Sequence, residues 1–337
     1  YGDIVSLAGD LFGDPANPIA QCKKNQKGTC FLKQFADLNR TGTEQDKFCQ
    51  SAFYRKNEYF KVYADIRSAL EDGMQHGQSN PEVYKGLQGE LNKRYNRISC
   101  GGSKLSALLP FGGYINLASV NFDHFYPDSV EAYKVGHKQA LNSALKAYHA
   151  WHQEYDITKA HQLLQVAYAQ NAFASHFLTD SFSSGHMRVP RLIIHNKVFL
   201  MAPLKLLLAN FMHDEDNNQG LNVINSHGQR WHAYGDGHLF TPKASKQRHI
   251  MINALQISAD DIFATFKTGV IPNIDSTLSY LPKYELIESM NETTPLFKVA
   301  NNKLLLRKDL LNHYSSNYTK YWSGLITFIT LEIISGK

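Results

Sequence analysis

Apolar and polar positions along the chain repeat mostly with the period of a helix, whereas the strict alternation typical of strands is scarce. We therefore predict a mainly α fold, a compact helical domain. The helical pattern covers five segments before residue 190, and Thr158 is the expected cap of the last of them. These predicted helices span residues 3–12, 58–72, 81–97, 129–151 and 158–181.

The second half of the chain adds helical patterns over 191–212, 243–268 and 303–334, the last of which predicts one or two closing helices. Large apolar residues between Leu192 and Met212 are interrupted by two lysines. This segment either lies on a membrane surface or forms a buried helix whose lysine side chains extend to solvent. No apolar run reaches the length of about 18 residues that a membrane-spanning helix needs.

Polar segments divide this pattern into a main domain over 1–290 and a C-terminal helical extension over 291–337, which is either separate or part of the same domain. Residues 13–50 are rich in lysine and contain three cysteines, which predicts a disulfide-pinned loop region inserted in the main domain. Residues 213–238 predict a second loop. Its acidic start, His213 to Asn217, either holds Ca²⁺ or another ion through oxygen ligands or is simply solvated.

Composition narrows the class of protein. The 337 residues carry a formal net charge of +5 without a basic stripe, so we expect no stable nucleic-acid partner, and we expect a monomer. Four cysteines without a Cys-x2-Cys pair predict two disulfides with three possible pairings. Disulfides favour an oxidising compartment, and a first residue that is not Met fits removal of a leader, so we expect a secreted protein. The cysteines are Cys22, Cys30, Cys49 and Cys100.

The most informative motif is His176-x3-Asp180-x5-His186. His176 and Asp180 are four residues apart, so on a helix they share one face. The run from Phe182 to Gly185 would end the helix and allow His186 to fold back beside them. Imidazole nitrogens together with a carboxylate suit zinc. The alternative interpretation is a helix with two incidental histidines and a capping aspartate.

The histidines concentrate in the middle of the chain, where 13 of the 15 lie between His124 and His249. This clustering predicts one metal site assembled from several segments. His124 follows Asp123 among aromatic residues just before a predicted helix. His232 and Asp236 repeat the His-x3-Asp spacing. Five others lack a carboxylate at ligand spacing and are interpreted as structural or exposed, and no role is assigned to His137 or His213. The five are His149, His152, His161, His195 and His249.

In combination, these motifs resemble the zinc-dependent bacterial phospholipases C, relatives of the single-strand-specific zinc nucleases. The family signature His-x3-Asp-x5-His is matched by His176, Asp180 and His186, and an upstream His-Phe motif by His124-Phe125-Tyr126. A downstream His-x3-Glu or His-x3-Asp motif is matched by His232 and Asp236. The resemblance covers residues 110–240 and the N-terminus. It implies an all-helical secreted enzyme with three zinc ions.

The resemblance also implies a set of ligands. One ion would be held by His124, His176 and Asp180. Asp180 would bridge to a second ion, which Tyr1 would bind through its amine and carbonyl, and Asp10 stands in for an early histidine ligand of the family. Asp123 or Asp10 would act as general base or as a further ligand. The third ion would be held by His186, His232 and Asp236.

The implied reaction is attack of zinc-bound hydroxide at the phosphorus of a glycerophospholipid such as phosphatidylcholine. It would release diacylglycerol and a phosphorylated head group, and the partner would be phospholipid at a membrane surface. Two alternatives stay open. One is a zinc-dependent nuclease or phosphomonoesterase on the same metal cluster, and the other is a non-enzymatic binding protein that uses metal structurally.

Overall fold

The computed structural model describes most of the chain, and the described part is mainly helical, as the pattern predicts. Cys49, Cys100, Asp236 and most of the helix expected over 81–97 lie outside the described residues. The description covers residues 1–14, 16–39, 52–78, 82–83, 86–87, 90–91, 94, 118–235, 237–239 and 241–335.

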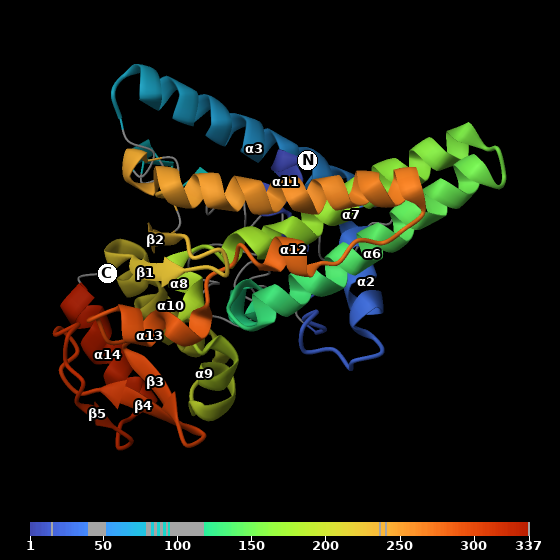
Figure 1. Cartoon of the computed structure of the whole chain (residues 1–337). Coiled ribbons are helices and arrows are strands. Elements are labelled where there is room, and N and C mark those ends of the chain that lie inside the picture. The colour runs from blue at the N-terminus through green and yellow to red at the C-terminus, as the bar shows by residue number, and fades with distance from the viewer. Residues whose placement is uncertain are drawn as a thin grey trace.

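Two long helices, α6 (Asp128–His152) and α7 (Ile157–Asp180), run side by side through the centre of the molecule (Figure 1). Small residues on their facing sides let the helices approach closely. A Cβ added to Gly136 would lie only 2.6 Å from the Cβ of Ala174. The cap of α7 is Asp156 rather than the predicted Thr158, because the Asp156 carboxylate accepts the N–H of Lys159 at 2.9 Å.

Helix α1 (Gly2–Leu11) packs on α7, and α11 (Ser245–Thr268) packs on both α6 and α7. Both lie where the pattern predicts a helix. Figure 1 shows α11 crossing the central pair, with α3 (Ala52–Gln75) above α11 in this view. The largest core cluster lies between these helices and contains Phe31, Tyr133, Phe173, Phe177 and Leu178.

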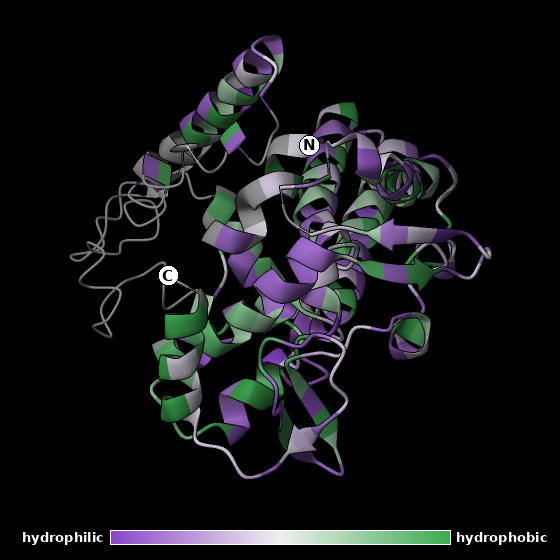
Figure 2. Cartoon of the chain, turned by 90° about the vertical axis from the view of Figure 1, so that its left-hand side faces the viewer, coloured by the Kyte–Doolittle hydropathy of each residue, from purple (hydrophilic) through white to green (hydrophobic). Residues whose placement is uncertain are grey.

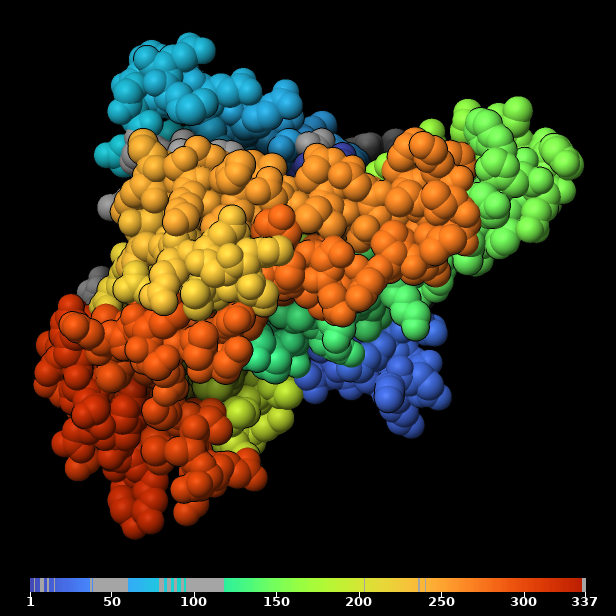
Figure 3. All heavy atoms as spheres, viewed as in Figure 1, coloured from blue at the N-terminus to red at the C-terminus, as the bar shows by residue number. Residues whose placement is uncertain are grey.

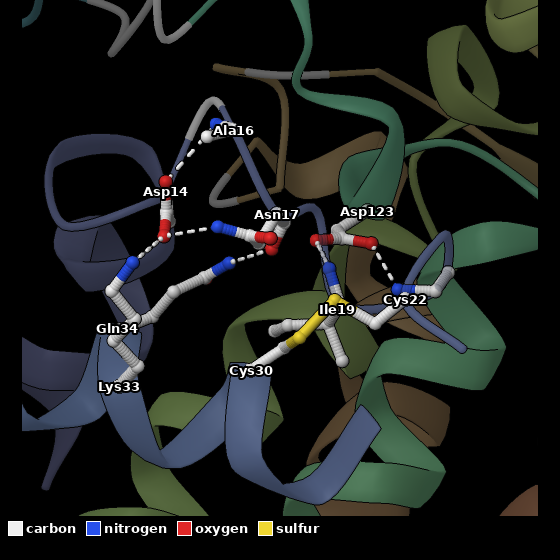
Figure 4. The surroundings of a disulfide bond; sticks show 10 residues. Asp14, Ala16, Asn17, Ile19, Cys22, Cys30, Lys33, Gln34 and Asp123 are labelled. Atoms are coloured by element: carbon white, nitrogen blue, oxygen red, sulfur yellow. Dashed lines mark hydrogen bonds and ion pairs between the residues drawn. A yellow bond between two sulfur atoms is a disulfide. The ribbon is translucent and has the colours of Figure 1, made fainter. Parts of the chain in front are cut away.

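The expected loop region 13–50 is partly helical, which corrects the prediction. Residues 27–39 form α2 (Lys27–Asn39), because Phe31 and Phe35 bury one face of this segment against Phe173. The turn before α2 is closed by the disulfide Cys22–Cys30 (Figure 4). One of the two predicted disulfides is therefore present, and its pairing is settled.

The single helix expected over 191–212 is two helices, α9 (Arg191–Lys197) and α10 (Ala202–Gln219), after the short α8 (Ser184–Met187). The backbone is extended at Val198 and Met201, and Pro203 stands in the first turn of α10, where a helix accepts proline. Helix α10 continues to Gln219. The acidic segment that starts at His213 is thus helical and not the predicted loop.

The rest of the predicted loop 213–238 contains an antiparallel hairpin, in which Asn222 pairs with His232. Short helices join the larger elements. The hairpin strands are β1 (Leu221–Ile224) and β2 (Arg230–Ala233), and the short helices are η2 (Phe122–His124), η3 (Pro242–Ala244), α12 (Asp275–Leu278), η4 (Tyr284–Leu286) and α13 (Ile287–Met290).

The C-terminal extension is not wholly helical, which corrects a second prediction. It forms a three-stranded antiparallel sheet and one helix. Asn301 and Asn302 have positive φ values and make the two-residue turn between the first two strands. The sheet and helix share a core with Val189, Ile194 and Leu208 of the preceding segments. These elements are β3 (Phe297–Ala300), β4 (Lys303–Arg307), β5 (Tyr318–Thr319) and α14 (Gly324–Ser335).

Figure 3 shows the C-terminal residues, in red, gathered on one side of the molecule. Helix α10 contacts α14, and α9 contacts β4, so the extension is attached through the two helices that precede the hairpin. None of the helices in the described part of the chain is long and apolar enough to cross a membrane.

Candidate metal centre

Three side chains from distant parts of the chain converge where α6 begins and α7 ends. Asp10 comes from α1, His124 from η2 and His176 from α7. One ligand atom of each lies within 4.8 Å of the others, a spacing that could hold a metal ion. The Nε2 atom of His176 is 3.2 Å from Nδ1 of His124 and 3.9 Å from Oδ1 of Asp10. Two imidazoles and a carboxylate form a donor set suited to zinc.

Asp180 joins this cluster through the spacing that the sequence motif predicts. It lies one turn after His176 on α7, and its Oδ2 is 2.8 Å from Nδ1 of His124 and 3.5 Å from Nε2 of His176. Its other oxygen faces a different side, where Oδ1 is 3.6 Å from Nδ1 of His186. A carboxylate whose two oxygens face two sets of imidazoles is placed to bridge two ions.

The electrostatics of the cluster match a cation site. Burial would lower the pKa of His124, but the carboxylates of Asp180 and Asp10 outweigh it and raise the pKa to about 9. Burial opposes ionisation of Asp180, yet the surrounding histidines hold its pKa below the ordinary value. Positive charge is therefore favoured at this point. A metal ion would take the place of the histidine proton, because a ligating imidazole is neutral.

The backbone of α1 orients His176. The Nδ1–H of His176 donates to the carbonyl oxygen of Val5 at 2.8 Å. A carbonyl only accepts, so this bond places the proton on Nδ1 and leaves the Nε2 lone pair facing Asp10 and His124. The ring packs directly on Gly9, where an added Cβ would lie 2.1 Å from Cδ2 of His176. Helix α1 thus supplies one ligand and positions another.

A second pair of histidines lies on the other side of Asp180. The ring centroids of His186, on α8, and His213, on α10, are 5.1 Å apart. Asn217, one turn after His213, accepts the backbone N–H of Gly185 at 3.0 Å and fixes α8 against α10. Sequence reasoning assigned no role to His213. The signal was the spacing His213-x3-Asn217, which puts an imidazole and an amide on one helix face.

His232, the predicted partner of His186, has other contacts. Its Nδ1 is 2.9 Å from Oδ1 of Asn222 on the paired strand, and its Nε2 donates to the carbonyl oxygen of Gln219 at 2.8 Å. Both ring nitrogens are thus engaged around the hairpin. Asp236, the other predicted ligand, lies outside the described residues.

Asp123 has a structural environment, contrary to the expectation that it acts as base or ligand. Its two carboxylate oxygens accept the backbone N–H groups of Ile19 and Ala20 at 2.6 and 2.8 Å. Figure 4 shows this carboxylate facing the turn next to Cys22. Burial raises the pKa of Asp123 to about 6, against the two backbone hydrogen bonds. Asp123 therefore anchors the disulfide turn beside η2.

Tyr1 does not reach Asp10. Asp10 is nine steps along the chain from Tyr1, which span roughly 13 Å at a helical rise of about 1.5 Å per residue. The Tyr1 carbonyl accepts the N–H groups of Ile4 and Val5, and its phenol oxygen accepts the Asn171 amide at 2.7 Å. The predicted pairing of Tyr1 with Asp10 around one ion is therefore absent from this structure, because Gly2–Leu11 is helical.

The acidic segment of α10 does not gather its carboxylates around one point. Asp216 forms an ion pair with Arg188, and Glu215 forms one with the fully buried Arg307. Asp214 instead accepts the side-chain amide of Asn210 at 2.9 Å. Asp216 and Glu215 hold α10 to its neighbours, whereas Asp214 bonds within the helix. The three carboxylates thus face different partners, and their arrangement gives no support to the predicted Ca²⁺ site.

The cluster is open on one side. Asp10 and His124 line a pocket that is open to solvent, and the other lining residues include Asp14, Asn121, Asp123 and Phe177. The Asp10 side chain is 43% exposed, whereas His124 and His176 are almost fully buried. A site with buried ligands and one accessible side leaves room for a water or substrate oxygen.

Comparison of the chain with protein-family models, with curated proteins and with solved structures finds no match.

Proposed function

We propose that this protein is a zinc-dependent phosphodiester hydrolase that cleaves glycerophospholipids, such as phosphatidylcholine, to diacylglycerol and a phosphorylated head group. The observation that carries the proposal is the position of Asp180 between two histidine pairs, one of which opens to a pocket. The resemblance of the His176, Asp180 and His186 motif to the zinc phospholipases C supplies the reaction class.

The first half of the proposed centre consists of Asp10, His124, His176 and Asp180. A bound zinc would lower the pKa of a bound water toward neutrality and neutralise charge that develops on phosphate oxygens. Val5 holds the tautomer and the orientation of His176, and Asp180 lies beside Nδ1 of His124, where both could share the ion. Asp10 is the most exposed of the four and faces the pocket, which makes it the residue best placed to accept a proton from an attacking water.

The second half consists of His186 and His213, with Asn217 fixing the turn between them. We assign His213 to this half in place of His232, because its ring lies beside that of His186. The Phe125 ring packs on His186, with centroids 4.7 Å apart, and excludes water from one side of the pair. The two halves share Asp180, so substrate oxygens could contact both ions.

Secretion is part of the proposal. The Cys22–Cys30 disulfide is compatible with an extracellular protein, and a lipid-degrading enzyme that acts outside the cell needs this stability.

The test is metal content together with turnover of a chromogenic phosphocholine ester. We expect two or three equivalents of zinc per chain by elemental analysis, and turnover that chelation abolishes and added zinc restores. His213→Ala and His232→Ala form a matched pair of variants. We expect only His213→Ala to lose zinc and turnover.

Single-stranded DNA and a phosphomonoester serve as competing substrates. If either substrate is turned over faster than the phosphocholine ester, the same centre is that of a nuclease or a phosphomonoesterase and not of a phospholipase. Folded protein that binds no zinc would overturn the proposal.

A further inference from the structure

An apolar surface lies on the C-terminal side of the molecule, and its side chains belong to none of the core clusters. It consists of two residues that precede α10 and four residues of α14, and we call it the C-terminal apolar surface. Phe199 is fully exposed, and Ile333 is 76% exposed. Exposed apolar patches of this kind are uncommon on soluble proteins and mark interaction sites. The six residues are Phe199, Met201, Leu325, Ile326, Ile329 and Ile333.

Packing at Gly324 brings the two segments together. An added Cβ at Gly324 would lie 2.8 Å from Val198 and 3.0 Å from Leu200. Val198 and Leu200 therefore face α14, while Phe199, at a tight turn in which the Leu200 N–H donates to the Val198 carbonyl, and Met201 face outward. The burial pattern agrees, since Val198 is buried and both Phe199 and Met201 are exposed.

Helix α14 does not need its outer face for folding. Its inner face contributes Leu331 to the neighbouring core and packs Phe328 against Phe211, with ring centroids 6.5 Å apart. Ile326, Ile329 and Ile333 follow one another at helical spacing on the other side. In Figure 2, the helix that leads to the label C is coloured mostly as hydrophobic.

Charge around this surface points to the kind of partner. Lys197 is two residues before Phe199, Lys320 is four residues before the start of α14, and both are exposed. The Nζ of Lys320 lies 4.8 Å from the ring of Tyr321, which is 81% exposed. Glu332, the one carboxylate of α14, is only partly exposed. Apolar side chains with lysine and tyrosine at the rim match the interface of an anionic membrane.

We propose that the C-terminal apolar surface docks on anionic phospholipid membranes, with Phe199 and the outer face of α14 inserted and the lysines at the head groups. A second copy of this chain fits less well, because a symmetric contact would place the flanking lysines of the two copies around the same patch. Docking would bring the proposed enzyme to its lipid substrate and in this respect rests on the proposed function. The evidence for docking itself is the exposed apolar surface.

The experiment is cosedimentation with vesicles of phosphatidylcholine mixed with phosphatidylserine, with chelator present so that no lipid is cleaved. We expect binding that weakens with added salt and with pure phosphatidylcholine. The double variant Phe199→Ser, Ile326→Ser should lose at least about tenfold in affinity. The control is Ile252→Ser, Phe263→Ser, which changes an isoleucine and a phenylalanine that are about half exposed on α11 and should bind like the original protein.

Turnover of a soluble phosphocholine ester separates docking from chemistry, because both double variants should keep it. If Phe199→Ser, Ile326→Ser loses vesicle binding but keeps turnover, the proposal is supported, whichever phospholipid the enzyme prefers to cleave. Absence of vesicle binding by the folded original protein overturns it. Equal loss in the control variant, or a concentration-dependent dimer that disappears in Phe199→Ser, Ile326→Ser, would also overturn it, the latter in favour of a second copy.

Discussion

Two histidine–carboxylate clusters contact helix α7, and in the described part of the chain the first of them lines a pocket, whereas the second is buried. In the first, His176 and His124 face Asp10 and Asp180 beside solvent. In the second, His137 of α6 is fully buried, with Nε2 3.4 Å from Oδ2 of Asp261.

The second cluster is closed by neutral partners. The Nδ1–H of His137 donates to Asn171 at 2.7 Å, and Ser258 donates to the same oxygen at 3.1 Å. Tyr133 donates in turn to Ser258 at 2.9 Å. None of these residues lines the pocket described above. The comparison teaches that histidines and carboxylates together do not identify a metal site. Access from solvent and the number of carboxylates distinguish a set of candidate ligands from a buried hydrogen-bond network.

The largest expected effect is on metal binding. His176→Ala should lower zinc affinity by at least about a hundredfold, because it removes a direct ligand and leaves Asp10 and Asp180 facing each other. Titration against a zinc indicator measures the change. The control is His76→Ala, which changes an exposed histidine on the surface. If the zinc affinity of His176→Ala is unchanged, the first cluster is not a metal site and does not differ from the second in this respect.

His137→Ala should act on stability instead. The substitution leaves a cavity and unpairs the buried Asn171, and we expect a loss of roughly 2–4 kcal/mol in the free energy of unfolding. Urea denaturation monitored by circular dichroism measures it. Zinc content should stay the same at a temperature where the variant is folded. Loss of zinc from the folded variant would show that the second cluster also binds metal.

Gly9→Ala tests the positioning of a ligand. The new methyl group would collide with the His176 ring, and we expect zinc affinity to fall by about ten- to a hundredfold. Gly2→Ala is a matched control on the same helix, because a Cβ there meets nothing within 4 Å. Both variants are titrated with zinc in parallel. Equal affinities would mean that α1 does not hold the ring.

The smallest effect concerns Asp14, a carboxylate at the pocket that we interpret as structural. Burial opposes its ionisation, but hydrogen bonds from Lys33, Asn17 and Ala16 lower its pKa. A lowered folded-state pKa means that its stabilisation is present above the unfolded-state value near 4 and is lost as the pH falls through the folded-state value. Asp14→Asn should therefore cost about 0.5–1 kcal/mol at pH 7, and this difference should vanish in acid. Urea denaturation at several pH values measures it, and loss of zinc in the variant would make Asp14 a ligand.

Long-range contacts explain where the sequence predictions were wrong. Asp123 was expected to act as general base or as a ligand, and both of its carboxylate oxygens accept backbone N–H groups of Ile19 and Ala20, some hundred residues earlier. The strands after residue 296 were expected as helices, although the Asn301-Asn302 turn was readable from the sequence as a hairpin signal.

The sequence by itself determined the central helices and the shared face of His176 and Asp180, because helical periodicity and a four-residue spacing are local properties of the chain. Only the tertiary structure decided that His213 and not His232 lies beside His186, and that Tyr1 stands apart from Asp10. These outcomes depend on how α1, α8 and α10 pack. Packing sums many weak contacts between distant residues, and no local pattern specifies that sum.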